Sequence, residues 1–278
     1  MHALPDTWPV EVTDAVIAVV GEVRDSAPLT GLSGREVRRV DGERASVVVK
    51  GDVHPRELAF YVHAAPRVAD LVPTLHGYVE TGHAGWLVLE HLPGPLPPEL
   101  WTSPAVYDVL ATLHTAADVY DGLDDPFRPE WTDAMTTTAQ RALGIDLARL
   151  AHDTRGLLSS DTPVSGDPNP RNWGVRADGS VALFDWERAG LASPAVDVAI
   201  TLPGLPTRHE ADDAAAAYSS ARQRLGAPLE VPLHAHSLLL LKLWTAVELL
   251  DEHRPDDALR DTQQWLIGAL PAWIVSWT

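Results

Sequence analysis

The chain has 278 residues, of which 45% are hydrophobic, and its formal net charge at pH 7 is −18. This length can bury one large core or two modest lobes, and the acidic excess excludes the basic stripe with which proteins neutralise nucleic-acid phosphates. The absence of cysteine excludes disulfides, thiolate metal sites and cysteine nucleophiles.

The sequence also argues against secretion and membrane insertion. The opening residues MHALPDTWPVEVTD contain no basic n-region and no apolar h-region, so we expect no secretory signal. The richest apolar stretch, residues 237–250, is interrupted by Lys242 and Glu248 and is too short to span a bilayer. We therefore expect a cytoplasmic protein with no membrane partner, no nucleic-acid partner and no obligate protein partner.

The first 94 residues predict a small sheet with one helix. Asp41-Gly42 is a two-residue hairpin signal, and Pro55 begins a helical stretch that Pro66 ends. The expected elements are a helix over 13–23, a hairpin within 28–50, a helix over 55–65 and strands over 75–80 and 85–92. We assign residues 1–94 to an N-terminal lobe, which a stiff connector, PGPLPP, joins to the rest of the chain.

Helical patterns dominate from Ser103 onward, because Ser103 suits an N-cap and Pro104 suits the first helical position. Apolar spacing predicts helices over 104–120, 132–152, 194–201, 208–225, 232–253 and 256–275, and a small β-rich segment lies over 163–185. Residues 95–278 are thus expected to form a mostly helical C-terminal lobe. The predicted fold class is α+β and bilobal.

The β-rich segment predicts a metal site at the open end of a hairpin. Asp178-Gly179 lies between two apolar runs, which indicates a tight turn. Asn172 and Asp185 are equally distant from this turn, so we expect them to face each other about 4.5 to 5.5 Å apart. An amide oxygen and a carboxylate placed in this way suit one Mg²⁺ ion.

A third polar group, Asp167, precedes Asn172 by five residues in a loop that Pro168 and Pro170 stiffen. Its carboxylate could orient a hydroxyl in line with a terminal phosphate and accept the hydroxyl proton. Each part alone is more often plain surface structure. Together they indicate phosphoryl transfer.

The stretches GDPNPRN and FDWERAGLASPAVDVA resemble the catalytic loop, metal-binding turn and following helix of the aminoglycoside phosphotransferase family. That family is a branch of the protein-kinase-like fold. The resemblance implies that Asp167 is the catalytic aspartate and that Asn172 and Asp185 bind Mg²⁺. It also implies that Asp197 braces the catalytic loop through backbone hydrogen bonds, and that ATP or GTP is the co-substrate.

The N-terminal lobe offers the matching nucleotide site. Lys50 resembles the strand lysine that contacts the α- and β-phosphates, and Glu57 resembles the glutamate that pairs with it. Residues Glu90 to Leu92 would present backbone groups to the adenine. Residues 30–40, which include two glycines, occupy the position of the phosphate-covering loop.

Two positions depart from the family pattern. Ser165 stands where the family usually has a histidine, which puts the rigidity of the catalytic loop in question more than its chemistry. Arg171 is bulkier than the residue frequently found before the metal-binding asparagine. His114 matches a common family helix position, and we expect it in the core or supporting the site rather than in catalysis.

The acceptor is less well defined by the sequence. An acidic, tryptophan-bearing wall would suit a cationic acceptor, although such charge runs are equally often solvated helix faces. The candidates are Glu187, Trp244, Glu248, Asp251, Glu252, Asp256 and Asp257. We favour a resistance phosphotransferase for a cationic antibiotic such as an aminoglycoside. The alternatives are a metabolic kinase for a sugar, choline or homoserine-like substrate, and a catalytically silent nucleotide-binding module.

Overall fold

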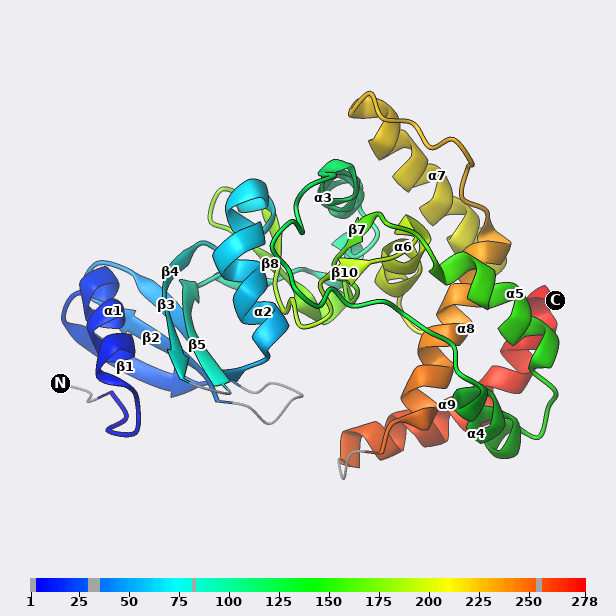
Figure 1. Cartoon of the computed structure of the whole chain (residues 1–278), viewed down its shortest axis with the longest axis horizontal. Coiled ribbons are helices and arrows are strands. Elements are labelled where there is room, and N and C mark those ends of the chain that lie inside the picture. The colour runs from blue at the N-terminus through cyan, green and yellow to red at the C-terminus, as the bar shows by residue number, and fades with distance from the viewer. Residues whose placement is uncertain (1–3, 30–35, 82–83, 254–256) are drawn as a thin grey trace. The chain divides into compact units, whose positions relative to one another are not determined.

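The computed structural model describes residues 4–29, 36–81, 84–253 and 257–278 (Figure 1). The chain divides into two compact units. Unit 1 comprises Met1–Pro95, Asp118–Pro126 and Asn172–Ala189, and unit 2 comprises Leu96–Ala117, Phe127–Arg171 and Gly190–Thr278. The predicted α+β class is confirmed, because an antiparallel sheet dominates unit 1 and helices dominate unit 2.

Unit 1 is built on a five-stranded sheet with the order β1-β2-β3-β5-β4. Its strands are β1 (Val23–Pro28), β2 (Val37–Gly42), β3 (Ser46–Val53), β4 (Leu75–Thr81) and β5 (Ala84–Glu90). A smaller sheet of order β6-β8-β9 contains β6 (Gly94–Pro95), β8 (Trp173–Val175) and β9 (Val181–Leu183). Helix α1 (Val10–Val20) places Val12, Val16 and Val20 on one face, where they share a core with Val47 of β3 (Figure 1).

The first hairpin turns later in the chain than the sequence predicts. Asp41 and Gly42 are the last residues of β2, and the Gly42 N–H donates to the Ala45 carbonyl across residues 43–44. A side chain at Gly42 would place its Cβ 2.3 Å from the carbonyl oxygen of Val20. Glycine is therefore needed here for the close approach of α1 and not for the turn.

The helix that begins at Pro55 does not end at Pro66, contrary to the prediction. Helix α2 (Pro55–Ala59) continues as a π-helical turn over Phe60–Ala64 and a 3₁₀ helix over Ala65–Leu71. Pro66 lies in the first turn of that 3₁₀ helix, where the missing N–H is not required. The helix therefore changes type here, and it is interrupted at Val68, which has non-helical backbone angles (φ −132°, ψ 36°).

The hairpin of β8 and β9 has a longer loop than predicted. The Arg176 N–H donates to the Ser180 carbonyl at 2.8 Å, so the loop consists of the residues between these two. Gly179, at the end of the loop, has a φ of 87°. A left-handed glycine at this position is typical of three-residue hairpin loops.

The longer loop shifts the hairpin register by one residue. Trp173 pairs with Leu183, and the Phe184 N–H donates to the Asn172 carbonyl at 2.9 Å. Asn172 therefore lies opposite Phe184, and the prediction that it directly faces Asp185 is wrong.

Unit 2 is organised around α8 (Ala235–Asp251), most of whose residues are buried. The other elements are α3 (Pro104–Thr115), α4 (Asp133–Leu143), α5 (Ala148–Leu158), α6 (Pro194–Thr201), α7 (Arg208–Arg224), α9 (Asp257–Trp277), β7 (Pro163–Val164), β10 (Gly190–Leu191) and a 3₁₀ turn at Pro98–Leu100. Helices α4, α5, α6, α7 and α9 all pack against α8 (Figure 1). The helix predicted over 132–152 is divided, because Gly144 with a φ of 68° ends α4.

None of the helices in the described ranges combines the length and the apolarity that crossing a bilayer requires.

Candidate active site

Lys50, on β3, lies among three carboxylates in unit 1. Its Nζ donates to both oxygens of Glu57, at 2.9 and 2.6 Å, and to Oδ1 of Asp185 at 2.9 Å. The Oε1 atom of Glu187 lies 3.7 Å from the same nitrogen. Because Lys50 and Glu57 are buried, salt screens this ion pair much less than it would an exposed pair.

The balance of charge in this cluster is negative. Burial by itself lowers the pKa of Lys50, but the carboxylates of Glu57 and Asp185 outweigh burial, so that this pKa is raised. Burial raises the pKa of Glu57, and Asp185 adds to this increase against the opposing effect of Lys50. The raised pKa of Lys50 favours its charged form and so favours the ion pair, whereas the raised pKa of Glu57 favours its neutral form and so disfavours the pair. We take Lys50 as charged. The cluster has more carboxylates than ammonium groups, and this negative excess favours proton binding at each group, which explains why the pKa values of both Lys50 and Glu57 are raised.

The start of α2 positions Glu57. The helix begins at Pro55, and the Nδ1 atom of His54 accepts a hydrogen bond from the Arg56 N–H at 3.1 Å. Arg56 also ties the helix to the opposite side of the cluster, because its Nη1 donates to the Glu187 carbonyl at 2.8 Å. The Arg56 guanidinium thus links the start of α2, which carries Glu57, to the backbone of Glu187.

Aromatic packing holds Asp185 in an unusual backbone conformation. Asp185 has a φ of 67°, in the left-handed region that residues other than glycine seldom adopt. The next residue, Trp186, is fully buried and stacks on Phe60 with ring centroids 3.9 Å apart. Its Nε1 also donates to the Leu183 carbonyl at 3.0 Å. The anchored indole therefore fixes the backbone from which Asp185 and Glu187 project.

The carboxylates of this cluster can hold a hard cation. Glu57, Asp185 and Glu187 each offer one oxygen, and these atoms lie within 4.8 Å of one another. The sequence placed Glu187 among the acceptor candidates, whereas its carboxylate lies beside those of Glu57 and Asp185; its position two residues after Asp185 was the available signal. Asn172 is buried immediately before β8. The glycines expected to cover the phosphates lie within residues 30–35, outside the described ranges.

Glu90 and Leu92, expected near the adenine, lie at the end of β5 and just beyond it. The Glu90 carboxylate accepts hydrogen bonds from Nε of Arg176 at 3.0 Å and from the Thr74 N–H at 3.0 Å. Leu92 packs closely on Gly174, where a Cβ would meet the Leu92 Cδ1 atom at 2.4 Å. The segment is therefore tied to the hairpin of β8 and β9.

In unit 2, Asp197 of α6 braces the backbone that leads to Asp167. The fully buried Asp197 carboxylate accepts hydrogen bonds from the N–H groups of Ser165 at 2.7 Å and Gly166 at 2.9 Å. Ser165 takes part in this bracing through its amide, whereas its buried hydroxyl has no hydrogen-bond partner among the described residues. The replacement of histidine by Ser165 thus leaves the backbone of the loop held in place.

His114 of α3 extends this brace into a buried chain of hydrogen bonds. Its Nε2 lies 3.1 Å from Asp197, its Nδ1 lies 2.8 Å from the Tyr218 hydroxyl, and Nη1 of Arg222 donates to that hydroxyl at 3.3 Å. Burial raises the pKa of Tyr218 to about 12, so the hydroxyl keeps its proton and donates it to Nδ1. The Nε2–H of His114 then donates to Asp197. His114 supports the loop from the core.

Asp167 is half-buried and follows the braced backbone directly. Its Oδ1 accepts a hydrogen bond from Nδ2 of Asn169 at 2.9 Å. The Oδ1 atom of Asn169 accepts in turn from the Arg171 N–H at 2.9 Å. The Asp167 carboxylate is thus oriented by the loop that carries it.

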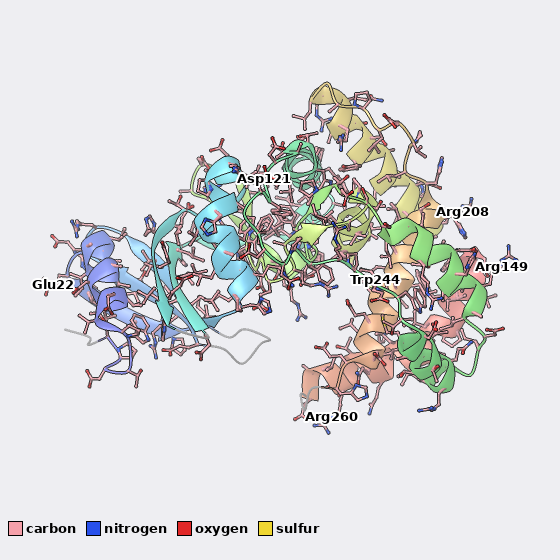
Figure 2. The ribbon with its side chains drawn as sticks, in the orientation of Figure 1. Glu22, Asp121, Arg149, Arg208, Trp244 and Arg260 are labelled. Atoms are coloured by element: carbon pink, nitrogen blue, oxygen red, sulfur yellow. The ribbon has the colours of Figure 1, made fainter. Side chains whose placement is uncertain are left out.

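The predicted acceptor wall is only partly a surface. Trp244 projects from α8 (Figure 2) but is fully buried, and its Nε1 donates to the Glu130 carbonyl at 3.0 Å. The expectation that its ring face meets a cation is therefore wrong. The half-buried acidic candidates are Glu248, Asp251 and Glu252. Asp256 lies outside the described ranges.

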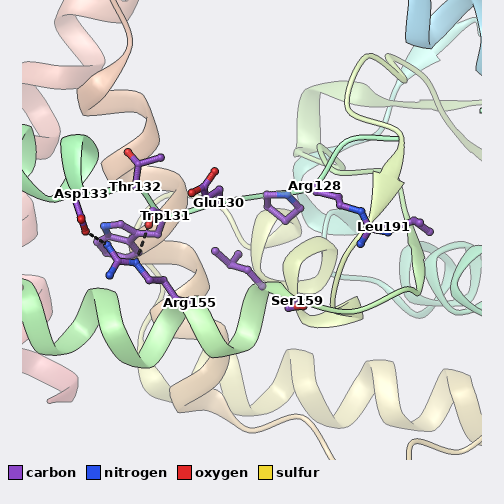
Figure 3. Close-up of a pocket in the computed structure, with 10 residues that line it drawn as sticks. Arg128, Glu130, Trp131, Thr132, Asp133, Arg155, Ser159 and Leu191 are labelled. Atoms are coloured by element: carbon purple, nitrogen blue, oxygen red, sulfur yellow. Dashed lines mark hydrogen bonds and ion pairs between the residues drawn. The ribbon is translucent and has the colours of Figure 1, made fainter. Parts of the chain in front are cut away.

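A cavity of about 460 Å³ lies in unit 2 (Figure 3). Arg155 is tied to its wall, donating from Nε to the Trp131 carbonyl at 2.8 Å and pairing with Asp133 at 2.5 Å. The other lining residues are Arg128, Pro129, Glu130, Thr132, Leu158, Ser159 and Leu191. Leu191 pairs with Pro163 of β7, the strand that leads into the Asp197-braced loop. None of the acidic acceptor candidates lines this cavity.

The sequence matches a family described as the phosphotransferase enzyme family over residues 26–234. The chain belongs to this family. No curated protein sequence matches this phosphotransferase. The match confirms the predicted family resemblance.

Solved structures of low sequence identity share the fold of the phosphotransferase. The choline kinase LicA from Streptococcus pneumoniae has 13% identity and a TM-score of 0.60, covering 94% of this chain and 98% of that chain. An ethanolamine kinase from Plasmodium vivax has 14% identity and a TM-score of 0.60, covering 91% and 83% respectively. A mutant of the aminoglycoside phosphotransferase APH(4)-Ia, in a ternary complex with AMP-PNP and hygromycin B, has 16% identity and a TM-score of 0.57, covering 96% and 98%. The kinase-like fold predicted from the sequence is confirmed.

Proposed function

We propose that this phosphotransferase moves the γ-phosphoryl group of ATP or GTP to a hydroxyl of a small, cationic acceptor, and that it requires Mg²⁺. The observation that carries the proposal is the buried cluster in which Lys50 contacts both Glu57 and Asp185. A lysine–glutamate pair beside a metal-binding aspartate is the arrangement on which kinase-type transfer depends. An antibiotic such as an aminoglycoside is the favoured acceptor.

In this proposal unit 1 binds the nucleotide. Lys50 contacts the α- and β-phosphates, and Glu57 holds the ammonium in place. The backbone from Glu90 to Leu92 receives the adenine. Asn172 and Asp185 would hold Mg²⁺, which neutralises charge on the phosphates when it is bound. The excess of carboxylates over ammonium in the cluster supports such an ion, because a divalent cation would offset the remaining negative charge.

Asp167 acts as the proton acceptor for the incoming hydroxyl. The hydroxyl oxygen forms a bond to the γ-phosphorus while the bond between that phosphorus and the β–γ bridging oxygen breaks. The hydroxyl proton passes to the Asp167 carboxylate, and the nucleoside diphosphate leaves. The hydrogen bonds from Asp197 to Ser165 and Gly166 support this role, because a proton acceptor must be held in a fixed position.

A cationic acceptor fits the net charge of −18, since an acidic protein raises the local concentration of cations. The names of the similar structures point in the same direction, because choline and ethanolamine carry a positive charge at neutral pH. These two names also make a metabolic alcohol kinase the second candidate. Both candidates use the same residues of the chain.

A nucleotide-consumption assay tests the proposal. Purified protein is incubated with Mg²⁺ and ATP or GTP against aminoglycosides, cationic peptide antibiotics, macrolides, sugars and choline, and products are identified by mass spectrometry. We expect acceptor-dependent release of diphosphate and one phosphorylated cationic product. Asp167→Asn, a close match in shape, is the control for contaminating kinases. Nucleotide binding without any turnover would instead support a catalytically silent module.

A resistance assay separates the two enzymatic candidates. The wild-type gene and the Asp167→Asn variant are expressed in a susceptible host, and the inhibitory concentration of each antibiotic is measured. A rise that depends on Asp167 supports the resistance role. Phosphorylation of choline or a sugar with no change in susceptibility supports the metabolic role.

A further inference from the structure

Arg176, the residue after β8, joins three segments of unit 1 that are distant in the sequence. Its Nε donates to both oxygens of the Glu90 carboxylate, at 3.0 and 3.2 Å. Its Nη1 donates to the Asp70 carbonyl at 3.1 Å, and its Nη2 donates to the Val72 carbonyl at 2.6 Å. The side chain is only 17% exposed. All three nitrogens of one guanidinium therefore bind oxygens of the protein.

The first segment is the end of the helical stretch that begins with α2. Asp70 lies in the last turn of the 3₁₀ helix, and Val72 is its C-cap residue. Carbonyls at the end of a helix have no partner within the helix, and a cation at this end also interacts favourably with the helix dipole. The same stretch carries Glu57 in its first turn. Arg176 thus fastens the far end of the stretch to the hairpin of β8 and β9.

The second segment begins at Glu90, to whose backbone we assign the adenine. The Glu90 carboxylate also accepts hydrogen bonds from the Thr74 N–H at 3.0 Å and from the Thr74 hydroxyl at 3.3 Å. The Glu90 N–H in turn donates to the Thr74 carbonyl at 2.8 Å. The carboxylate is therefore held by Thr74, the residue before β4, as well as by Arg176. The sequence assigned a role only to the backbone of Glu90, and the side chain is what anchors that backbone.

The third segment is the hairpin of β8 and β9, next to which both proposed metal ligands lie. Asn172 immediately precedes β8, and Asp185 follows β9 by two residues. The chain beyond Glu90 also pairs with β8 through β6, which is only two residues long. So short a pairing does little to fix the angle between two segments. The bond from Arg176 to Glu90 is a further point of attachment, and it constrains that angle.

We propose that Arg176 is a positioning residue for the nucleotide, which holds the adenine-binding segment and the hairpin of the metal ligands at the spacing that one nucleotide spans. A ligand with two recognition groups gains affinity from the second group only where the protein presents both sites at the right separation. Arginine suits this task because its planar fork binds several oxygens at fixed angles. The inference rests on the proposed function, which assigns the adenine and Mg²⁺ to these two places.

The test compares three probes by calorimetric titration in the presence of Mg²⁺. The probes are the nucleoside triphosphate that wild type prefers, its nucleoside, and inorganic tripolyphosphate. In Arg176→Met we expect the Kd of the triphosphate to rise about tenfold, the effect of losing one charged hydrogen-bonded pair. The Kd of the nucleoside and of tripolyphosphate should each change less than about twofold, because each probe engages only one of the two places. Equal losses for nucleoside and triphosphate would overturn the inference.

Arg44→Met is the matched control. Arg44 is another arginine of unit 1 that donates to two backbone carbonyls, those of Ile17 and Ala18. It fastens α1 and, among the described residues, bonds to none of those assigned to the nucleotide. We expect this variant to lose stability without changing the ratio of the triphosphate and nucleoside affinities. If both methionine variants changed the three affinities alike, Arg176 would have a structural role only and the inference would be overturned.

Two further variants keep the test decisive if Arg176→Met folds poorly. Glu90→Gln keeps the shape and the backbone of the adenine-binding segment, and it should reproduce the selective loss without adding to that of Arg176→Met. Arg176→Lys keeps the charge but not the fork, so it should recover only part of the triphosphate affinity. Full affinity in Arg176→Lys and in Glu90→Gln would overturn the inference.

The outcomes also separate the inference from the proposed function. A wild-type protein that binds neither ATP nor GTP would contradict the proposed function, and the inference would fail with it. A wild-type protein that binds and consumes the nucleotide, with an Arg176→Met variant of undiminished triphosphate affinity, would overturn the role of Arg176 and leave the proposed function in place.

Discussion

The two lysines of the chain lie in contrasting environments. In unit 1, Lys50 donates to Glu57 and Asp185, and these carboxylates raise its pKa despite burial. In unit 2, Lys242 donates to one carbonyl, and burial lowers its pKa to about 8. Burial lowers the pKa of both side chains, so the two carboxylates bonded to Lys50 account for the opposite outcome there.

The contrast implies different uses of the same side chain. Lys50 stays charged throughout the physiological range and can serve as a permanent contact for phosphates. Lys242 changes its charge close to physiological pH, so that small changes in its surroundings alter its state. Of the two lysines of the chain, Lys50 thus keeps its charge across the physiological pH range, whereas Lys242 loses its charge near pH 8.

The largest effect is expected from removing Asp185, the carboxylate of unit 1 that we propose binds Mg²⁺. Asp185→Asn should abolish Mg²⁺-dependent nucleotide binding with little loss of stability, because asparagine keeps the shape and tolerates the left-handed backbone. Calorimetric titration with and without Mg²⁺ measures this. If nucleotide binding by the variant still depended on Mg²⁺ as in wild type, the proposed role of Asp185 would be contradicted. Lys50 would then remain as the proposed phosphate contact of unit 1.

The next effect concerns Asp167, the proposed proton acceptor in unit 2. Asp167→Ala should lower turnover by roughly 10² to 10⁴, the usual contribution of a positioned acid–base group. Nucleotide affinity should change little, because the nucleotide is assigned to unit 1. Initial rates and nucleotide binding measured on the same preparation test this, and equal activity in variant and parent would contradict the role of Asp167.

Stability in unit 2 should depend strongly on Asp197. Asp197→Ala removes the acceptor for two buried N–H groups and for His114, so unfolding should require about 3 to 5 kcal/mol less free energy. Urea denaturation measures the difference. A loss below about 1 kcal/mol would show that the loop is held by other contacts.

The smallest expected effect is a gain in stability when Lys242 is replaced by an apolar residue. The depressed pKa of Lys242, about 8 against 10.5, means that the charged form is disfavoured in the folded state. The unfolded chain binds more protons between these values, so wild-type stability should rise with pH across that window. Lys242→Met should lack this rise and be more stable at pH 7 by about 1 to 3 kcal/mol. A methionine variant less stable than wild type would contradict the inference that burial disfavours the charged form of Lys242.

The Lys50–Glu57 pair of unit 1 could be predicted from the sequence because each residue lies in a short, recognisable local pattern. Lys50 ends a run of valines, and Glu57 follows Pro55 in the first turn of a helix. The hairpin register was missed for a physical reason. Asp-Gly is compatible with both two- and three-residue loops, and only the left-handed Gly179 placed at the end of the longer loop sets the pairing.

Other features depended on long-range packing that no local pattern encodes. Lys242 stood out in the sequence as an interruption of an apolar run, and its hydrogen-bond partner, the Leu202 carbonyl, is distant along the chain. The burial of Trp244 had no signal for the same reason, since its partner is the Glu130 carbonyl. Phe60, which begins the π-helical turn, likewise stacks on Trp186, a residue distant along the chain.

The positive φ of Asp185 implies that a saturation library at this position would separate two kinds of failure. Glycine, asparagine and aspartate occupy the left-handed region at low steric cost, whereas β-branched residues do so only under strain. Glycine and asparagine variants should therefore be recovered as well-folded proteins without phosphotransfer. Valine and isoleucine variants should also accumulate poorly, so abundance and activity would rank the same substitutions in different orders.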